Sequence, residues 1–139
     1  MKDVVARIAR LRALQARMAQ AERVKAQAEL DDAVATEQGW RDALTASNTA
    51  MSSGGADAVG RGVFALNGEM RRRQAQGHVN QLAQTVQEHD QRVLEREREQ
   101  KVAERLVERR AVRRRAERQR KEQSELDELA RNGWFRRDG

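Results

Sequence analysis

The sequence predicts an all-α protein: a long antiparallel two-helix coiled-coil hairpin with an overhanging C-terminal helix. Three observations predict this class. The chain of 139 residues contains no proline, the residue that most strongly breaks a helix. Aromatic residues make up only 3% of it and charged residues 36%, so it cannot bury a globular core of ordinary size. Apolar residues recur at steps of three and four along two segments, which places them on one helix face.

The first expected helix covers residues 2–47, which are rich in the strong helix formers alanine, arginine, glutamine and leucine. Apolar side chains follow one another here at steps of three or four and predict one apolar face. They are Val4, Ile8, Leu11, Leu14, Met18, Ala21, Val24 and Ala28. We expect this face to form the seam that packs against the second helix.

A tip over residues 48–68 separates the two expected helices. This stretch holds five of the nine glycines, together with serines and asparagines, which are typical of turns. Residues 60–65 match a loose dinucleotide-binding pattern, but no strand precedes them, as that pattern requires. We therefore interpret the glycines as the hairpin tip. Four apolar residues near the tip either close the end of the seam or form a docking surface: Val63, Phe64, Leu66 and Met70.

The second expected helix covers residues 69–131, and a short tail of residues 132–139 completes a single coiled-coil domain. Asn132 and Gly133 are typical of a helix C-terminus. The seam of this helix follows the alternating steps of a heptad repeat. It consists of Val79, Leu82, Val86, His89 and Val93. Because such a narrow seam buries little apolar area, we expect the hairpin to work inside a larger assembly.

The composition gives no support for an enzyme. The chain has no cysteine, and its only histidines are His78 and His89. Eleven residues apart on one helix, they would lie about 16 Å from each other and could not share a metal ion. No nucleophile with a base and an orienting group can be proposed. We expect no catalytic residue, no metal, no cofactor and no small-molecule substrate.

No segment approaches the ~18 apolar residues of a membrane span, and the N-terminus lacks the apolar core of a signal peptide. We therefore expect a cytoplasmic protein.

The strongest local feature is a basic run over residues 105–121. It holds nine basic side chains against two acidic ones, an excess larger than the net charge of +6 on the whole chain. An acidic protein enclosure is the partner that we favour. The alternative is a basic coiled-coil protein that binds nucleic acid or an anionic membrane surface. Against nucleic acid stands the absence of an aromatic stacking platform. A role in solubility alone also stays open.

In size, in its two long helices with a Gly/Ser break about 50 residues in, and in lacking cysteine, the chain resembles a known family. This is the FliJ/SctO (YscO-type) central stalk of flagellar and virulence type III secretion ATPases. Residues 126–131, Leu-Asp-Glu-Leu-Ala-Arg, resemble the Asp-Glu-x-Ala pattern near the C-terminus of flagellar members. Trp134 and Phe135, which follow, depart from that pattern.

The resemblance implies a stalk whose terminal end enters the pore of a hexameric export ATPase, at the inner membrane export apparatus. It also implies export chaperones as partners. The residues placed at the ATPase would be Arg7, Arg10, Arg12, Arg105, Arg109, Arg110, Arg113, Arg114, Arg115, Arg118, Leu126 and Leu129. The tip would face the export gate in the membrane, through Val63, Phe64, Leu66 and Met70.

Overall fold

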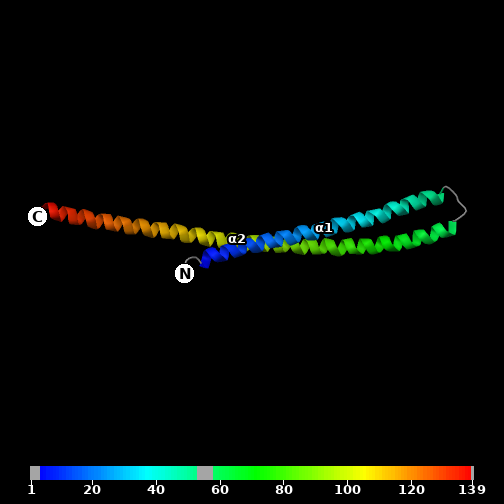
Figure 1. Cartoon of the computed structure of the whole chain (residues 1–139), viewed down its shortest axis with the longest axis horizontal. Coiled ribbons are helices and arrows are strands. Elements are labelled where there is room, and N and C mark those ends of the chain that lie inside the picture. Colours follow the sequence, from blue (N-terminus) through cyan, green and yellow to red (C-terminus); the bar gives the residue numbers. More distant parts are fainter. Residues whose placement is uncertain (1–3, 53–57, 139) are drawn as a thin grey trace. The chain divides into compact units, whose positions relative to one another are not determined.

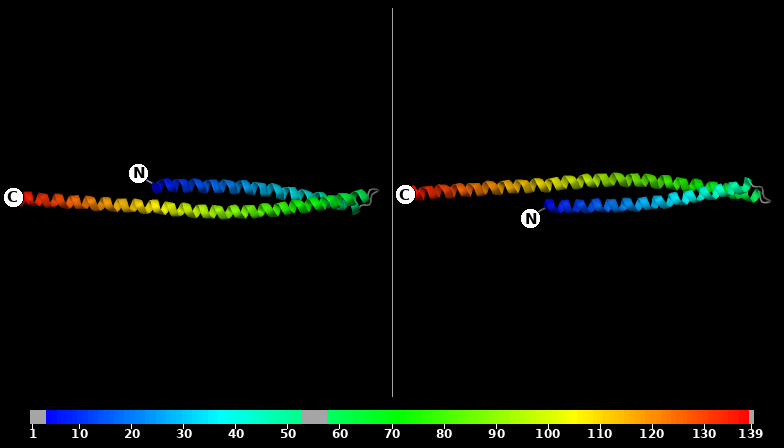
Figure 2. Two further views of the ribbon diagram at one scale, coloured as in Figure 1. Left: turned by 90° about the horizontal axis from the view of Figure 1, so that it is seen from below. Right: turned by 90° about the horizontal axis from the view of Figure 1, so that it is seen from above.

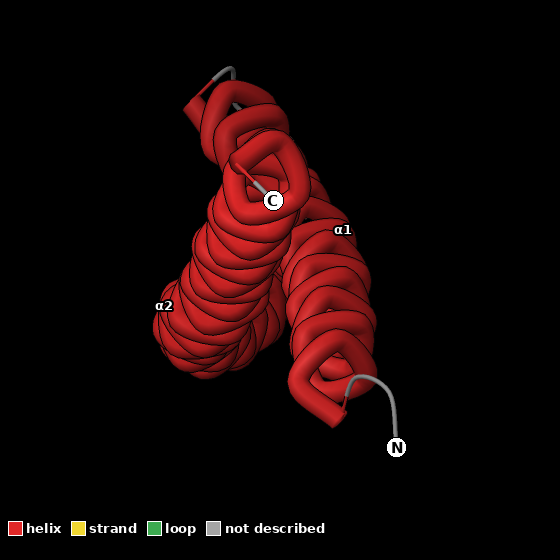
Figure 3. Tube along the Cα trace, turned by 90° about the vertical axis from the view of Figure 1, so that its left-hand side faces the viewer, coloured by secondary structure: helices red, strands yellow, loops and turns green. Residues whose placement is uncertain are grey.

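The computed structural model describes residues 4–52 and 58–138, and side chains over residues 4–49 and 59–133. The described chain consists of two α-helices without any strand (Figures 1 and 3). Helix α1 spans Val4–Ser52 and helix α2 spans Ala58–Asp138. The prediction of an all-α protein with two long helices that pack against each other is confirmed.

Both helices extend beyond their expected ends. Residues 48–52 and 58–68, expected in the tip, and residues 132–138, expected in the tail, are helical. A single glycine inside a helix costs only about 1 kcal/mol relative to alanine. At the start of α2, Arg61 separates the first two glycines, and the run Val-Phe-Ala-Leu-Asn over residues 63–67 separates the second from the third, so their cost does not end the helix. The centre of the expected tip, residues 53–57, lies outside the described residues.

The contacts of the chain define two units, to which both helices contribute. The mid-chain unit is Gln15–Arg96, and the terminal unit is Met1–Leu14 with Glu97–Gly139. In the mid-chain unit, Arg23 pairs with Asp90 and Glu37 with Arg72. The partner number falls as the residue number rises, so α1 and α2 are antiparallel within this unit (Figure 2).

The seam of the mid-chain unit is built from small residues on α1 and larger ones on α2. Val86 and Val93 of α2 are 7% and 8% exposed. The other expected seam residues of α2, Val79, Leu82 and His89, are half-buried, which confirms the expected face. The buried apolar residues of α1 in this unit are Ala16, Ala19, Ala26 and Ala33. Together with half-buried Arg23 and Leu30 they follow the alternating steps of a heptad.

The expected seam of α1 was wrong. Its large apolar residues Val4, Ile8, Leu11, Leu14, Met18 and Val24 are 44–58% exposed, and Ala21 and Ala28 are exposed as well. The seam positions are filled instead by alanines and by charged residues that pair with α2, such as Arg23. Because these residues are small or charged, the periodicity of large apolar side chains pointed to a different face of the helix.

In the terminal unit, the start of α1 packs on α2 around Ala103, which is 4% exposed. Val5 and Ala9 of α1 are half-buried, and the Arg12 guanidinium lies 2.9 Å from the Glu99 carboxylate. Over residues 108–133 every side chain is exposed except that of half-buried Ala116. Nowhere in the described part of the chain is a helix both long and apolar enough to cross a membrane.

Candidate functional site

The first surface, which we call the tip surface, consists of apolar side chains in the first turns of α2. Val59, Val63, Phe64, Leu66 and Met70 are 82%, 54%, 51%, 70% and 63% exposed. The sequence left open whether such residues close the end of the seam. All are more than half exposed, whereas the buried residue in this part of α2 is Gly68. The exposure therefore favours the docking alternative.

Gly68 lets the two helices come close together behind the tip surface. A Cβ atom at this position would lie 2.8 Å from Cδ2 of Leu44 on α1. Any larger residue would push the Leu44 side chain aside. Val59, Val63, Leu66 and Met70 thus lie on the opposite side of the helix from Gly68, whereas Phe64, one turn before Gly68, lies on the same side as that glycine.

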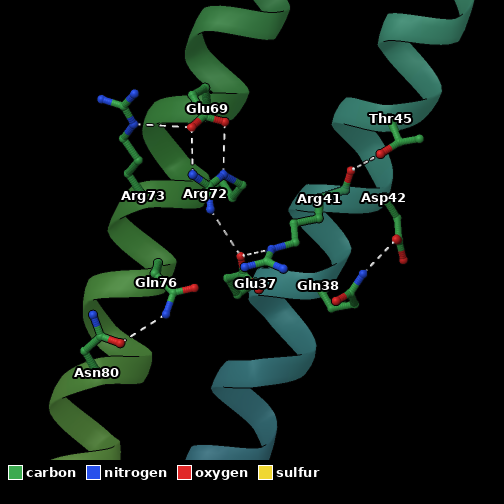
Figure 4. Close-up of polar contacts among 10 residues, drawn as sticks. All are labelled: Glu37, Gln38, Arg41, Asp42, Thr45, Glu69, Arg72, Arg73, Gln76 and Asn80. Atoms are coloured by element: carbon green, nitrogen blue, oxygen red, sulfur yellow. Dashed lines mark hydrogen bonds and ion pairs between the residues drawn. The ribbon is translucent and has the colours of Figure 1, made fainter.

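A charged cluster lies next to the tip surface in the mid-chain unit (Figure 4). Glu37 of α1 is 5% exposed and accepts hydrogen bonds from Arg41 and, at 3.5 Å, from Arg72 of α2. Arg72 also donates two hydrogen bonds, of 2.8 and 3.0 Å, to Glu69. Arg73 donates a third to Glu69 at 3.2 Å. The buried carboxylate is thus compensated by two guanidinium groups.

The hydrogen bonds from Arg72 are the main reason why the pKa of Glu69 falls from 4.5 to about 2, with Arg73 adding to the shift. The same contact raises the pKa of Arg72. Nearby, the guanidinium of Arg71 lies 5.4 Å from the ring centre of Trp40, within range of a cation–π contact. These contacts fix α2 against α1 directly below the tip surface.

The second surface, which we call the basic surface, lies in the terminal unit. It combines the arginines of α1 with those of the basic run, and all are exposed except half-buried Arg12. They are Arg7, Arg10, Arg12, Arg105, Arg109, Arg110, Arg113, Arg114, Arg115 and Arg118. Leu126 and Leu129, further along α2, are 59% and 67% exposed. The contacts thus bring the two sets of arginines into one unit.

An apolar groove of about 340 Å³ lies in the same unit. Ile8 of α1 and Val102 and Leu106 of α2 line it, and they are 44%, 55% and 48% exposed. The Arg12–Glu99 ion pair forms part of its wall. Sequence reasoning missed this groove because it assigned Ile8 to the seam. The sequence signal that could have revealed the groove is a second apolar face on α1, next to the face that carries the alanines.

The described residues contain no group of three or more histidines, cysteines, aspartates or glutamates that could hold a metal ion. The tip surface and the basic surface offer apolar contact and positive charge, respectively, which are the chemistry of partner binding. The side chains of Trp134 and Phe135 lie outside the described residues.

The chain was compared with protein families, curated proteins and solved structures. No curated protein and no solved structure matched the chain. The family described as the flagellar FliJ protein matched over residues 4–139, almost the entire length. The two long helices of the described chain agree with that match. The chain belongs to the flagellar FliJ family.

Proposed function

We propose that this chain is the non-enzymatic central stalk and adaptor of a type III protein export ATPase. Membership of the family makes it a flagellar export-related protein, and the lack of catalytic activity is part of the proposal. The finer role rests on one observation, the unequal charge of the two units. The terminal unit has 18 basic and 11 acidic residues, a net charge of +7, and the mid-chain unit has 10 and 11, a net charge of −1.

The terminal unit is the part that we place in the hexameric ATPase. The exposure of residues 108–133 supports a C-terminal helix that overhangs its partner and is free to enter a pore. Arginines around the helix would face acidic side chains of the enclosure, because opposite charges in a confined site attract strongly. Leu126 and Leu129 would add apolar contact near the end of the same helix.

The tip surface is the part that we place at the membrane export gate, through Val63, Phe64, Leu66 and Met70. Their exposure supports docking, since apolar residues exposed together mark interaction sites. This arrangement would hold the chain at the inner membrane export apparatus from the cytoplasmic side. Export chaperones are further partners that we propose on the family resemblance.

The test is co-purification of the full chain with the export ATPase. In one variant, Arg109→Glu, Arg113→Glu and Arg114→Glu reverse three charges of the basic surface. The matched control reverses three exposed charges of the mid-chain unit, Arg17→Glu, Lys25→Glu and Arg92→Glu. We expect ATPase binding to weaken at least tenfold in the first variant only. Equal binding by both variants would overturn the proposal.

The same variants test the alternative of nucleic-acid binding. Counterion release makes such binding strongly dependent on salt. If the basic surface binds DNA at low salt and the ATPase is indifferent to the three arginines, nucleic acid replaces the ATPase as the proposed partner. The tip variant Phe64→Ser with Leu66→Ser should leave ATPase binding intact, because these residues belong to the other unit.

A further inference from the structure

The region around the tip is almost free of charge. Residues 43–68 contain only two charged residues, Asp57 and Arg61, in a chain of which 36% is charged. Alanine, glycine, serine, threonine and asparagine fill most of the remaining positions. A surface that only meets water has no need of such a composition, because charged residues are what normally keep exposed helices in solution.

Four large apolar residues in the first turns of α2 lie along one face of the helix, and Phe64, one turn before Gly68, lies outside that face. Val59, Val63, Leu66 and Met70 follow at steps of four, three and four, and they are 54–82% exposed. At 3.6 residues per turn, this stripe is on the opposite side of α2 from buried Gly68, which approaches α1. The stripe therefore faces away from the partner helix.

The residues that flank the stripe do not suit a partner helix. Coiled-coil partners are chosen by charged residues at the positions beside the apolar seam. Here those positions hold Gly60, Gly62, Asn67 and Glu69. Glu69 is already engaged by Arg72 and Arg73. Apart from Glu69, the flanking residues are small and uncharged, and an apolar stripe of this kind instead fits the boundary between lipid headgroups and acyl chains.

The neighbouring end of α1 is also suited to a less polar environment. The hydroxyl of Thr45 donates to the carbonyl oxygen of Arg41 at 3.0 Å, and that of Thr49 donates to the carbonyl oxygen of Thr45 at 2.9 Å. These polar groups keep a hydrogen-bond partner when water is removed, which lowers the cost of burying them.

We propose that the tip surface inserts into the headgroup–acyl boundary of a lipid bilayer, with Val59, Val63, Leu66 and Met70 entering first. The driving force is apolar area rather than charge, so the bilayer need not be anionic. The inference rests on the proposed function only for where the chain meets a membrane. Binding itself needs neither the ATPase nor a gate protein.

The experiment uses the full chain and vesicles of dioleoylphosphatidylcholine alone. These vesicles carry no net charge, so the basic surface contributes little to binding. We expect flotation with the vesicles, stronger on small than on large ones because curvature opens the headgroup layer, and little changed by salt. The double variant Val63→Ser with Leu66→Ser should weaken partitioning at least tenfold. The matched control, Val34→Ser with Leu94→Ser, removes side chains that are 46% and 53% exposed elsewhere in the same unit and should bind as the parent does.

A second measurement locates the contact. Because the chain has no cysteine, Val63→Cys and Gln84→Cys each give one site for an environment-sensitive dye. The dye at residue 63 should shift to shorter wavelength on vesicles, and the dye at exposed residue 84 should not.

Two outcomes would overturn the inference. One is that the chain does not bind neutral vesicles, and the other is that the tip variant and its control lose vesicle binding to the same extent. If the tip residues bind purified gate protein in detergent but not vesicles, the lipid contact is wrong while the proposed function stands. If binding needs anionic lipid and low salt, the contact lies at the basic surface and the inference is likewise wrong.

Discussion

Glu37 of α1 and Arg72 of α2 form an ion pair across the seam, with 3.5 Å between Oε1 and Nη1. The Glu37 side chain is only 7% exposed, so its charge is removed from water and depends on its partners. Arg41 approaches from the same helix. The pair is a buried charged layer in a seam made mostly of alanine, valine and leucine, with Arg23 and His89 half-buried in it, and it favours one register of the two helices.

Replacing Glu37 by lysine should therefore destabilise the mid-chain unit. The new cation would meet Arg41 and Arg72 in a site with little water. We expect a loss of about 3 kcal/mol in the free energy of unfolding, as is typical when one partner of a buried pair is removed. Thermal unfolding followed by circular dichroism measures it. Gln38→Lys, at the adjacent exposed position, is the control and should change stability by less than about 0.5 kcal/mol.

Val86→Asp should be far more damaging than Gln87→Asp. Val86 is 7% exposed in the seam, and a carboxylate there would be buried without a partner. Gln87 is exposed, so its replacement leaves the seam unchanged. We expect loss of helicity at moderate temperature for the first variant only. Equal melting curves would mean that the seam of α2 has been assigned to the wrong face.

The seam of α2 could be predicted from the sequence, but that of α1 could not. On α2 the seam residues are valines, a leucine and a histidine, so the periodicity of large side chains marks them. On α1 the same positions hold alanines and charged residues such as Arg23 and Glu37. These two charged residues can occupy the seam because they pair with Asp90 and Arg72, which are 67 and 35 residues away in sequence. Single-helix periodicity carries no information about such partners.

The candidate surfaces were predictable to a different extent. The part of the basic surface on α2 follows from composition alone, because the excess of arginine over residues 105–121 is visible without a structure. The arginines of α1 were added to it only by the family resemblance. The exposure of the tip surface depended on which side of α2 faces α1. That side is set by Gly68, whose lack of a side chain carries no apolar signal. The helical start of α2 was also missed, since its glycines predicted a turn.

Two glycine substitutions should separate helix propensity from packing. Gly77 has open space around the position of a Cβ atom, so Gly77→Ala should stabilise the chain by about 1 kcal/mol through helix propensity. Gly68→Ala gains the same propensity but must displace the Leu44 side chain, 2.8 Å away. We expect the free energy of unfolding, measured in urea, to rise less than for Gly77→Ala or to fall. An equal gain at both positions would contradict the close approach of the helices behind the tip surface.

The Glu69 carboxylate should make stability depend on pH in the acid range. Its pKa is lowered from 4.5 to about 2 by Arg72 and Arg73. Because the pKa is lower in the folded state, the ionised carboxylate contributes its full stabilisation when the pH is above the pKa of the unfolded state. That contribution is lost as the pH falls through the pKa of the folded state. The parent should therefore melt above Glu69→Gln at about pH 6, with a difference that shrinks towards about pH 2. A difference independent of pH would show that the carboxylate charge is not what Arg72 stabilises.

The last prediction concerns the leucines beyond the basic run. Leu126 and Leu129 are 59% and 67% exposed, so Leu126→Ser with Leu129→Ser should leave the melting temperature unchanged. If the C-terminal part of α2 enters the ATPase, these side chains become buried there, and their loss should weaken ATPase binding about tenfold or more. Leu94→Ser, at a residue 53% exposed in the mid-chain unit, is the control and should bind normally. Co-purification and stimulation of ATP hydrolysis measure both effects. Unchanged binding by the double variant would restrict the contact to the arginines, whereas a lowered melting temperature would mean that the leucines already pack within this chain.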